Sequence, residues 1–251
     1  HLTGMGNAFF MKSGDLILII YLLMVPAIAL IVGGFSSGSP LATIGAQREM
    51  VILMATELPI AVAIVTVAWR MGTLAPGSAP FALGTVAANP FWGGLGPIGV
   101  IGGILLLLTF MTIIPAEVAK IPFDQAEAET EIAEGLVAEY SGKHFAFFQL
   151  AEGIKAVAIT SLVVVMFFPQ GFTALTGYRL EVSGVNITIA ADIFFFLLKM
   201  FIVYSLSITL VRVSMARLKI TQVSRIFILI VTAISLSGFV MIYLDPAILK
   251  M

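Results

Sequence analysis

The sequence predicts an all-α, polytopic transmembrane helical bundle. Of its 251 residues, 60% are hydrophobic and only 11% are charged, whereas about 25% of the residues in a soluble domain are charged. The apolar residues also gather in long runs, and a helix needs about 20 of them to cross the hydrocarbon core of a bilayer. A soluble globule is therefore excluded.

Six apolar runs are long enough to be membrane spans. They cover residues 16–35, 50–69, 97–116, 144–168, 190–211 and 226–244. The sequence shows no internal repeat and no linker between domains, so we expect a single transmembrane domain over residues 1–251. The chain begins with His1, and we expect that its native N-terminus lies further upstream.

Basic residues in the connections predict the orientation, because cytoplasmic loops of membrane proteins are enriched in Lys and Arg. We expect the connections 36–49, 117–143 and 212–225 to be cytoplasmic, in the cell membrane of a prokaryote. The basic residues on this side are Arg48, Lys120, Lys143, Arg212, Arg217, Lys219 and Arg225; those on the other side are Lys12, Arg70, Arg179 and Lys250.

The third connection carries half of the acidic residues of the chain, between Glu117 and Glu139. If a helix begins at Pro122, its period places one acidic stripe on one side, formed by Asp124, Glu127, Glu131 and Glu134. The opposite side is apolar, so we predict an amphipathic loop helix that lies against the bundle or a partner. A solvated acidic helix is the alternative, but Glu129 falls on the apolar side, where an unpaired carboxylate is costly.

Charged residues also interrupt the predicted spans. Glu57 precedes Pro59 in the second span, Glu152 and Lys155 share a face of the fourth, and Lys199 lies in the middle of the fifth, two turns after Asp192. Charges at this depth should face the bundle interior or water. Each could simply be an interior salt bridge. Together with the acidic stripe, Glu139 and the fixed positive charge of Arg48, they predict a polar path for ions or protons and a coupling role.

Composition excludes several other functions for this chain. It has no cysteine, so it cannot supply thiolate ligands to an iron–sulfur or nickel–iron centre, and only His1 and His144 offer an imidazole. We therefore expect no cofactor or metal bound by this chain and no catalytic residue or redox centre of its own. No basic block suits a nucleic acid.

Three motifs resemble those of one family, subunit 1 of the NADH:quinone oxidoreductases. The segment from Ala119 to Glu131 (AKIPFDQAEAETE), followed by EYSGKHFA from Glu139, resembles its signature loop. The stretches from Gly38 to Glu49 and from Ser214 to Lys219 are more similar to the hydrogenase branch, as in formate hydrogenlyase and archaeal membrane-bound hydrogenases. The quinone enzymes usually have Asn-Arg where this chain has Ala119 and Lys120, which argues against quinone.

The resemblance implies a membrane anchor and coupling subunit. It would link ferredoxin-dependent hydrogen evolution, or sulfane sulfur reduction, in cytoplasmic subunits to H⁺ or Na⁺ transport. The implied partners are hydrogenase-like large and small subunits, antiporter-like membrane subunits and the lipid bilayer, and iron–sulfur clusters or a nickel–iron site would belong to these partners. Family members have eight spans, so two are expected before the six seen here. The alternatives are a quinone-chamber subunit and a stand-alone transporter, although no repeat supports the latter.

Overall fold

The computed structural model describes residues 15–133, 135–176, 181–182, 185–186 and 188–245. Within these ranges six helices are long and apolar enough to cross a membrane, which confirms the predicted fold class. They are Leu16–Ser36, Pro40–Leu74, Pro97–Glu117, Gly142–Leu175, Thr188–Ser214 and Ile220–Tyr243.

The first four spans are built around α2 (Leu16–Ser36), α3 (Pro40–Leu74), α5 (Pro97–Glu117) and α7 (Gly142–Phe167). The fifth consists of α9 (Thr188–Tyr204), the π-helical turn η3 (Ser205–Thr209) and α10 (Leu210–Ser214). The sixth consists of α11 (Ile220–Arg225), the π-helical turn η4 (Ile226–Val231) and α12 (Thr232–Tyr243). Short elements fill the connections: α4 (Leu83–Ala88), α8 (Phe172–Thr176) and an antiparallel pair of strands, β1 (Glu181–Val182) and β2 (Val185–Asn186).

Local chemistry explains where the first spans begin. Asp15 caps α2 by accepting a hydrogen bond from the backbone amide of Ile17 at 3.2 Å. Pro40 and Pro97 stand in the first turn of α3 and α5, where a missing N–H costs nothing. The prediction that α3 begins near residue 50 was too short, because the helix begins at Pro40. Arg48 therefore lies on the helix rather than in a loop.

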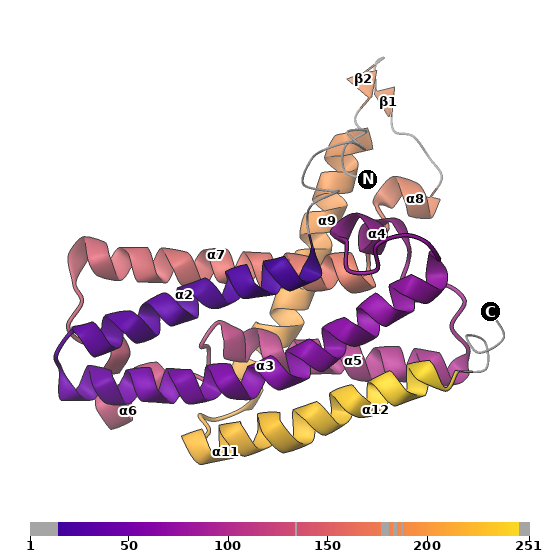
Figure 1. Cartoon of the computed structure of the whole chain (residues 1–251). Helices are drawn as coiled ribbons and strands as arrows, with labels where there is room; N and C mark the ends of the chain where they lie inside the picture. Colours follow the sequence, from indigo (N-terminus) through magenta and orange to yellow (C-terminus); the bar gives the residue numbers. More distant parts are fainter. Residues whose placement is uncertain (1–14, 134, 177–180, 183–184, 187, 246–251) are drawn as a thin grey trace.

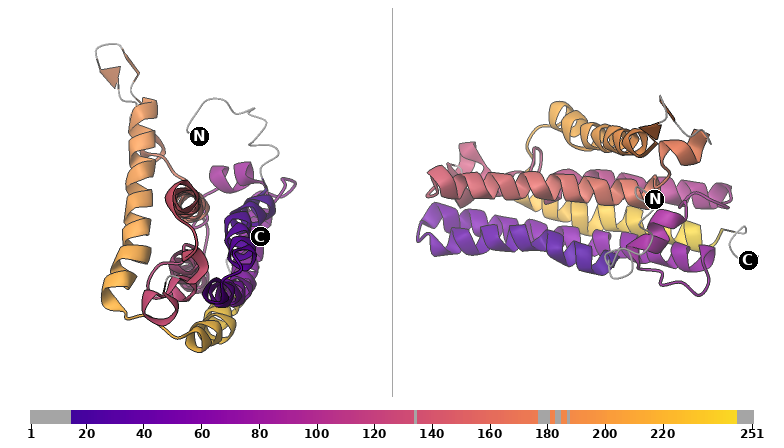
Figure 2. Two further views of the ribbon diagram at one scale, coloured as in Figure 1. Left: turned by 90° about the vertical axis from the view of Figure 1, so that its left-hand side faces the viewer. Right: turned by 90° about the horizontal axis from the view of Figure 1, so that it is seen from above.

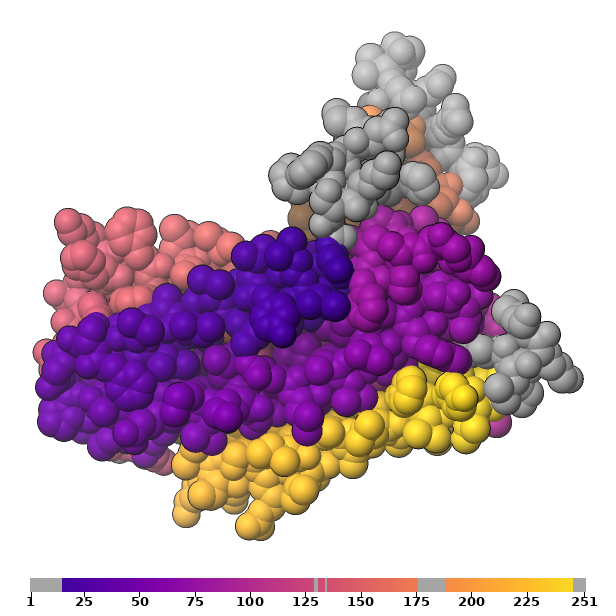
Figure 3. All heavy atoms as spheres, viewed as in Figure 1, coloured from indigo at the N-terminus to yellow at the C-terminus, as the bar shows by residue number. Residues whose placement is uncertain are grey.

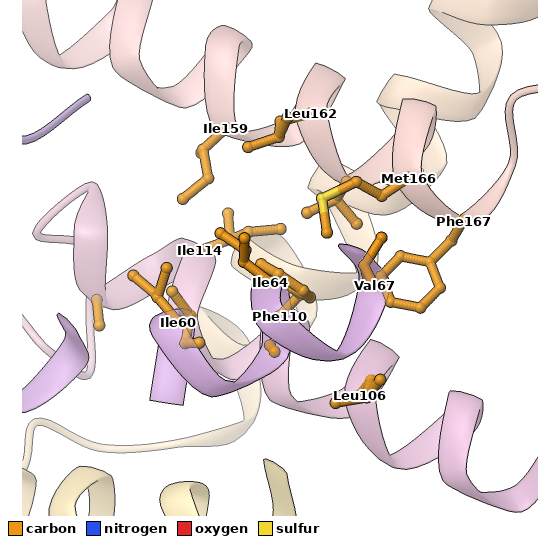
Figure 4. Close-up of a cluster of buried hydrophobic side chains, with 14 of the residues drawn as sticks. Ile60, Ile64, Val67, Leu106, Phe110, Ile114, Ile159, Leu162, Met166 and Phe167 are labelled. Atoms are coloured by element: carbon orange, nitrogen blue, oxygen red, sulfur yellow. The ribbon is translucent and has the colours of Figure 1, made fainter. Parts of the chain in front are cut away.

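The spans form one bundle in which α9 is set apart. In Figure 1, α2, α3, α5, α7 and α12 run alongside one another, whereas α9 crosses them steeply. Figure 2 shows this from the end of the bundle, with α9 standing beside helices that are seen end-on. The space-filling view shows α2 lying along α3 on one face of the molecule (Figure 3). The apolar core lies between α3, α5 and α7, and includes Ile64, Phe110 and Ile159 (Figure 4).

The loop helix predicted from Pro122 to Glu139 is not continuous, and this prediction was wrong. The described part of the loop contains three single turns: η1 (Gln125–Glu127), α6 (Glu129–Ile132) and η2 (Gly135–Val137). Ala133 has a φ of 48° and interrupts the helix after α6. The acidic residues consequently do not form a stripe on one helix face.

The apolar side of this loop faces the bundle itself, which settles the two alternatives left by the sequence. Leu136 is only 1% exposed, and Ala126 is also buried. At Gly45 of α3, an added Cβ would lie 2.6 Å from the Leu136 amide nitrogen and 2.8 Å from the Ala126 carbonyl oxygen. The loop backbone thus lies directly on α3, and only a glycine leaves room for it.

Candidate functional site

A cluster of charged side chains lies where the acidic loop meets α3, α5 and α7, at the end of the bundle marked by α6 in Figure 1. It joins four carboxylates and two amines that come from three spans and from the loop. We call it the carboxylate cluster: Glu49, Glu117, Glu127, Glu152, Lys120 and Lys155.

The innermost contact is a buried ion pair between α7 and the last residue of α5. The ammonium of Lys155 lies 2.9 Å from Glu117 Oε2, and the two side chains are 4% and 6% exposed. The Thr56 hydroxyl donates a hydrogen bond of 2.7 Å to Glu117 Oε1. Both oxygens of Glu117 are therefore occupied, as a charge in such an enclosed position requires.

A second group lies nearer the loop. Lys120 Nζ is 2.8 Å from Glu152 Oε2, and a hydrogen bond joins the carboxyl groups of Glu127 and Glu152. Burial raises the pKa of Glu127 to about 8, with further contributions from Glu152 and Glu49, while Lys120 opposes the shift. Two carboxyl groups can form a hydrogen bond only when one carries a proton, and this pKa places the proton on Glu127 at neutral pH.

Glu49 completes the cluster without an ion pair of its own. Its side chain is buried, and Glu49 Oε2 has no hydrogen-bond partner among the described residues; Glu152 Oε1 receives no other hydrogen-bond donor there. Among the surrounding charges, Lys155 attracts Glu49 most strongly, whereas Glu117 and Glu152 repel it. Because the carboxylates outnumber the ammonium groups by two, a neutral cluster holds two protons.

Two arginines anchor the loop around this cluster. Arg48 of α3 forms an ion pair of 2.5 Å with Glu131 and donates to the Gln125 carbonyl oxygen at 3.2 Å. Arg217 binds both oxygens of Asp124, at 2.6 and 2.9 Å. These contacts fix the loop both to α3 and to the connection that follows α10.

An apolar cavity of about 270 Å³ adjoins the cluster between α2, α3, α5 and α7. Side chains such as Tyr21, Ile60 and Leu162 line it, and Glu57 and Glu117 add two carboxylates to its wall. Glu117 therefore belongs both to the cluster and to the cavity. The exposed Glu57 stands at the cavity, away from the ion pairs of the cluster.

The structure brings together only some of the residues selected from the sequence. Glu127, Glu152 and Lys155 meet in the cluster, whereas Asp124 and Glu131 pair with arginines and Glu139 is exposed. Lys199 lies elsewhere: its ammonium donates to the Phe168 and Gln170 carbonyl oxygens, each at 2.7 Å, at the C-terminal end of α7. Asp192 accepts hydrogen bonds from Thr173. Glu134 and the side chain of Glu129 lie outside the described parts of the structure.

The sequence did not single out Glu49, Glu117 and Lys120. Glu49 was placed in a loop because the second span was predicted to begin one residue later. Glu117 and Lys120 were counted only as loop charges, although both stand just before the Pro122-Phe123-Asp124 core. Among the described residues, no group of three or more His, Cys, Asp or Glu side chains is arranged to hold a metal ion.

Comparisons with known proteins agree on one family. A family model described as NADH dehydrogenase matches residues 3–243. Hydrogenase-4 component C of Escherichia coli (strain K12) is 34% identical over 162 residues, which are 64% of this chain and 48% of that protein. The H-type subunit of the NADH-quinone oxidoreductase of Dehalococcoides mccartyi is 28% identical over 214 residues, which are 82% of this chain and 51% of that protein. The chain thus spans about half the length of these relatives.

A solved structure shares the arrangement of the helices. It belongs to the membrane-bound sulfane sulfur reductase, an archaeal respiratory membrane complex. The superposition has a TM-score of 0.74 at 27% sequence identity and covers 92% of this chain and 70% of the other. The fold is therefore that of a subunit in a membrane respiratory complex.

Proposed function

Because the chain belongs to the NADH dehydrogenase subunit 1 family, we propose that it is the membrane anchor and coupling subunit of an ion-translocating redox complex. Peripheral subunits carry out the electron transfer, and this chain transmits the event to ion transport. The observation that carries the proposal is the carboxylate cluster, in which buried acids outnumber buried amines between the loop and three spans. Such a cluster responds to any change of charge or position imposed on the loop.

The hydrogenase or sulfur-reductase branch suits the chain better than quinone reduction. The 34% identity to a hydrogenase component and the structural match to a sulfane sulfur reductase both support this choice. Lys120, at a position where the quinone enzymes have another residue, forms an ion pair with Glu152 inside the cluster. Hydrogenase-like large and small subunits would supply the iron–sulfur clusters or nickel–iron site, and antiporter-like subunits would move H⁺ or Na⁺.

The path for ions or protons would begin at the loop and continue into the membrane. Asp124 and Glu131 with Arg48, and the neighbouring Glu129, Glu134 and Glu139, form its acidic approach. Glu127, Glu152 and Lys155 follow, and Glu57 extends it along the cavity beside Glu117. Lys199 would belong to the far end of the bundle, where it binds the end of α7.

We propose that the connections 36–49, 117–143 and 212–225 face the cytoplasm of a prokaryotic cell, because basic residues gather there. Ala138 is exposed on the loop and is a suitable position for a cysteine label. We expect Ala138→Cys in inside-out vesicles to react with a membrane-impermeant maleimide, and the same variant in right-side-out vesicles to react only after lysis. Labelling of intact right-side-out vesicles would reverse the orientation.

The coupling role is tested by Glu127→Gln in the assembled complex. Gln keeps the shape and can donate a hydrogen bond to Glu152, but it cannot release a proton. We expect the peripheral subunits to remain bound, while ion uptake by reconstituted vesicles falls about tenfold, equivalent to about 1.4 kcal/mol. Redox turnover and ion uptake are measured on the same preparation.

Two further variants make this test specific. Glu127→Asp retains a carboxyl group and should restore part of the uptake. Asp15→Asn removes a carboxylate that caps α2 away from the cluster, and Asn is an equally good cap, so uptake should stay at the wild-type level. Wild-type turnover and uptake in Glu127→Gln would show that the cluster has no coupling role.

A further inference from the structure

Lys155 is placed between two buried carboxylates but forms an ion pair with only one of them in the described structure. It binds Glu117, while Glu49 attracts it and lacks an ion pair. We propose that Lys155 is a mobile charge that exchanges between Glu117 and Glu49, so that proton release by Glu49 draws the ammonium away from Glu117. This inference rests on the proposed function and identifies the moving part of the cluster.

The geometry leaves Lys155 free to make this exchange. An ammonium has three N–H donors on a flexible stem of four carbons, and the contact with Glu117 at 2.9 Å occupies one of those donors. Glu49 is only 6% exposed, and its Oε2 has no hydrogen-bond partner among the described residues. The Lys155 side chain is 4% exposed, so water offers it little alternative to these two carboxylates.

Burial couples the position of Lys155 to the protonation of Glu49. A buried carboxylate without a partner is strongly unfavourable, so Glu49 must either hold a proton or take the ammonium. In the described arrangement Lys155 stays with Glu117, which fits a protonated Glu49. Once Glu49 loses its proton, the balance of attraction shifts towards Glu49, and Glu117 is left with the Thr56 hydroxyl as its donor.

The exchange transfers one proton in net terms. Glu49 releases a proton towards the loop side, where Glu152 repels its carboxylate, and Lys155 crosses to Glu49 without changing its own charge. Glu117, now without the ammonium, takes up a proton on the side of the apolar cavity, where Glu57 stands. The total charge of the cluster is the same before and after. The lysine therefore prevents both carboxylates from being ionised and unpaired at once.

The direct test is the position of Lys155 in cryo-electron microscopy structures of the intact complex. In Glu117→Gln we expect the ammonium to leave residue 117 and to lie within hydrogen-bond distance of Glu49. In Glu49→Gln we expect it to remain on Glu117. A lysine that stays beside the amide introduced at position 117 while Glu49 keeps no partner would overturn the proposal, as would a lysine that contacts neither residue.

A second comparison does not depend on the stability of Glu117→Gln. Structures of the wild-type complex at pH 6 and pH 9 should show Lys155 on Glu117 and on Glu49 respectively, whereas Glu49→Gln should show it on Glu117 at both values. An unchanged wild-type position would contradict the exchange. The charged groups that act on Glu49 in this comparison are Lys155, Glu117 and Glu152.

Ion uptake separates failure of the exchange from failure of the coupling role. We expect Glu49→Gln to lower uptake about tenfold and Glu49→Asp to restore part of it. If Glu127→Gln abolishes uptake but Lys155 never moves, the subunit couples and the exchange is wrong. If neither variant affects uptake, the proposed function itself fails.

Discussion

Replacement of Lys155 by Met is expected to lower the free energy of unfolding by about 3 to 5 kcal/mol, because it leaves a buried carboxylate without its cation. Glu117 is 6% exposed and would retain only the Thr56 hydroxyl as a donor. Met preserves most of the volume and the unbranched shape of the lysine, so loss of packing contributes little. Thermal unfolding of the purified chain in detergent measures the effect.

Two matched variants identify the cause of this loss. The double variant Lys155→Met/Glu117→Gln removes both charges and should recover much of the lost stability. Lys120→Met removes the other amine of the cluster, but that side chain is 34% exposed, so its loss should cost no more than about 1 kcal/mol. Equal losses in Lys155→Met and Lys120→Met would mean that the depth of the ion pair is unimportant.

The pH dependence of stability should change in Glu127→Gln. The pKa of Glu127 is raised from 4.5 to about 8, so between these values the folded chain keeps a proton that the unfolded chain releases. The folded state therefore binds more protons, and the free energy of unfolding falls as the pH rises from about 4.5 to about 8. Below this window the contribution is fully present, and above it the contribution is lost.

Gln is neutral in both states and removes this pH dependence. We expect Glu127→Gln to match the wild type near pH 5 and to be more stable at pH 9 by on the order of 1 to 3 kcal/mol, a range lowered to allow for partial solvent access. Unfolding temperatures measured from pH 5 to pH 9 provide the comparison. Glu139→Gln, at an exposed position of the same loop, should follow the wild-type curve. Parallel curves for wild type and Glu127→Gln would show that Glu127 is already ionised in the folded state.

Hydropathy was sufficient to predict the spans, because each span contains a long apolar run that has no other favourable environment than a bilayer. The acidic loop was predicted poorly for a physical reason. Helical periodicity from Pro122 assumes that local preference decides the backbone, but tertiary contacts with Gly45 override it, and the left-handed conformation of Ala133 ends the helix. Nothing local marks Ala133 as such a residue.

The candidate site was predicted in its members rather than in its pairs. Glu152 and Lys155 were expected to share a face, and both lie in the cluster. Their partners are Lys120 and Glu117, which precede them by 32 and 38 positions and come from the other side of the loop. The spacing of charges along one helix does not determine which helices meet, so the pairing could not follow from the sequence.

The π-helical turn η4 changes which side chains of the last span can face the core. Buried residues recur there at intervals of four: Val223, Phe227, Val231 and Ser235. In a regular α-helix each interval of four would rotate the side chain by about 40°, or by about 120° over the three intervals. The wider turn slows this rotation, so that Ser235 still points inward and its hydroxyl donates to the Pro59 carbonyl oxygen at 3.3 Å. A helical wheel drawn over the whole span would therefore assign lipid-facing positions to residues that line the protein interior.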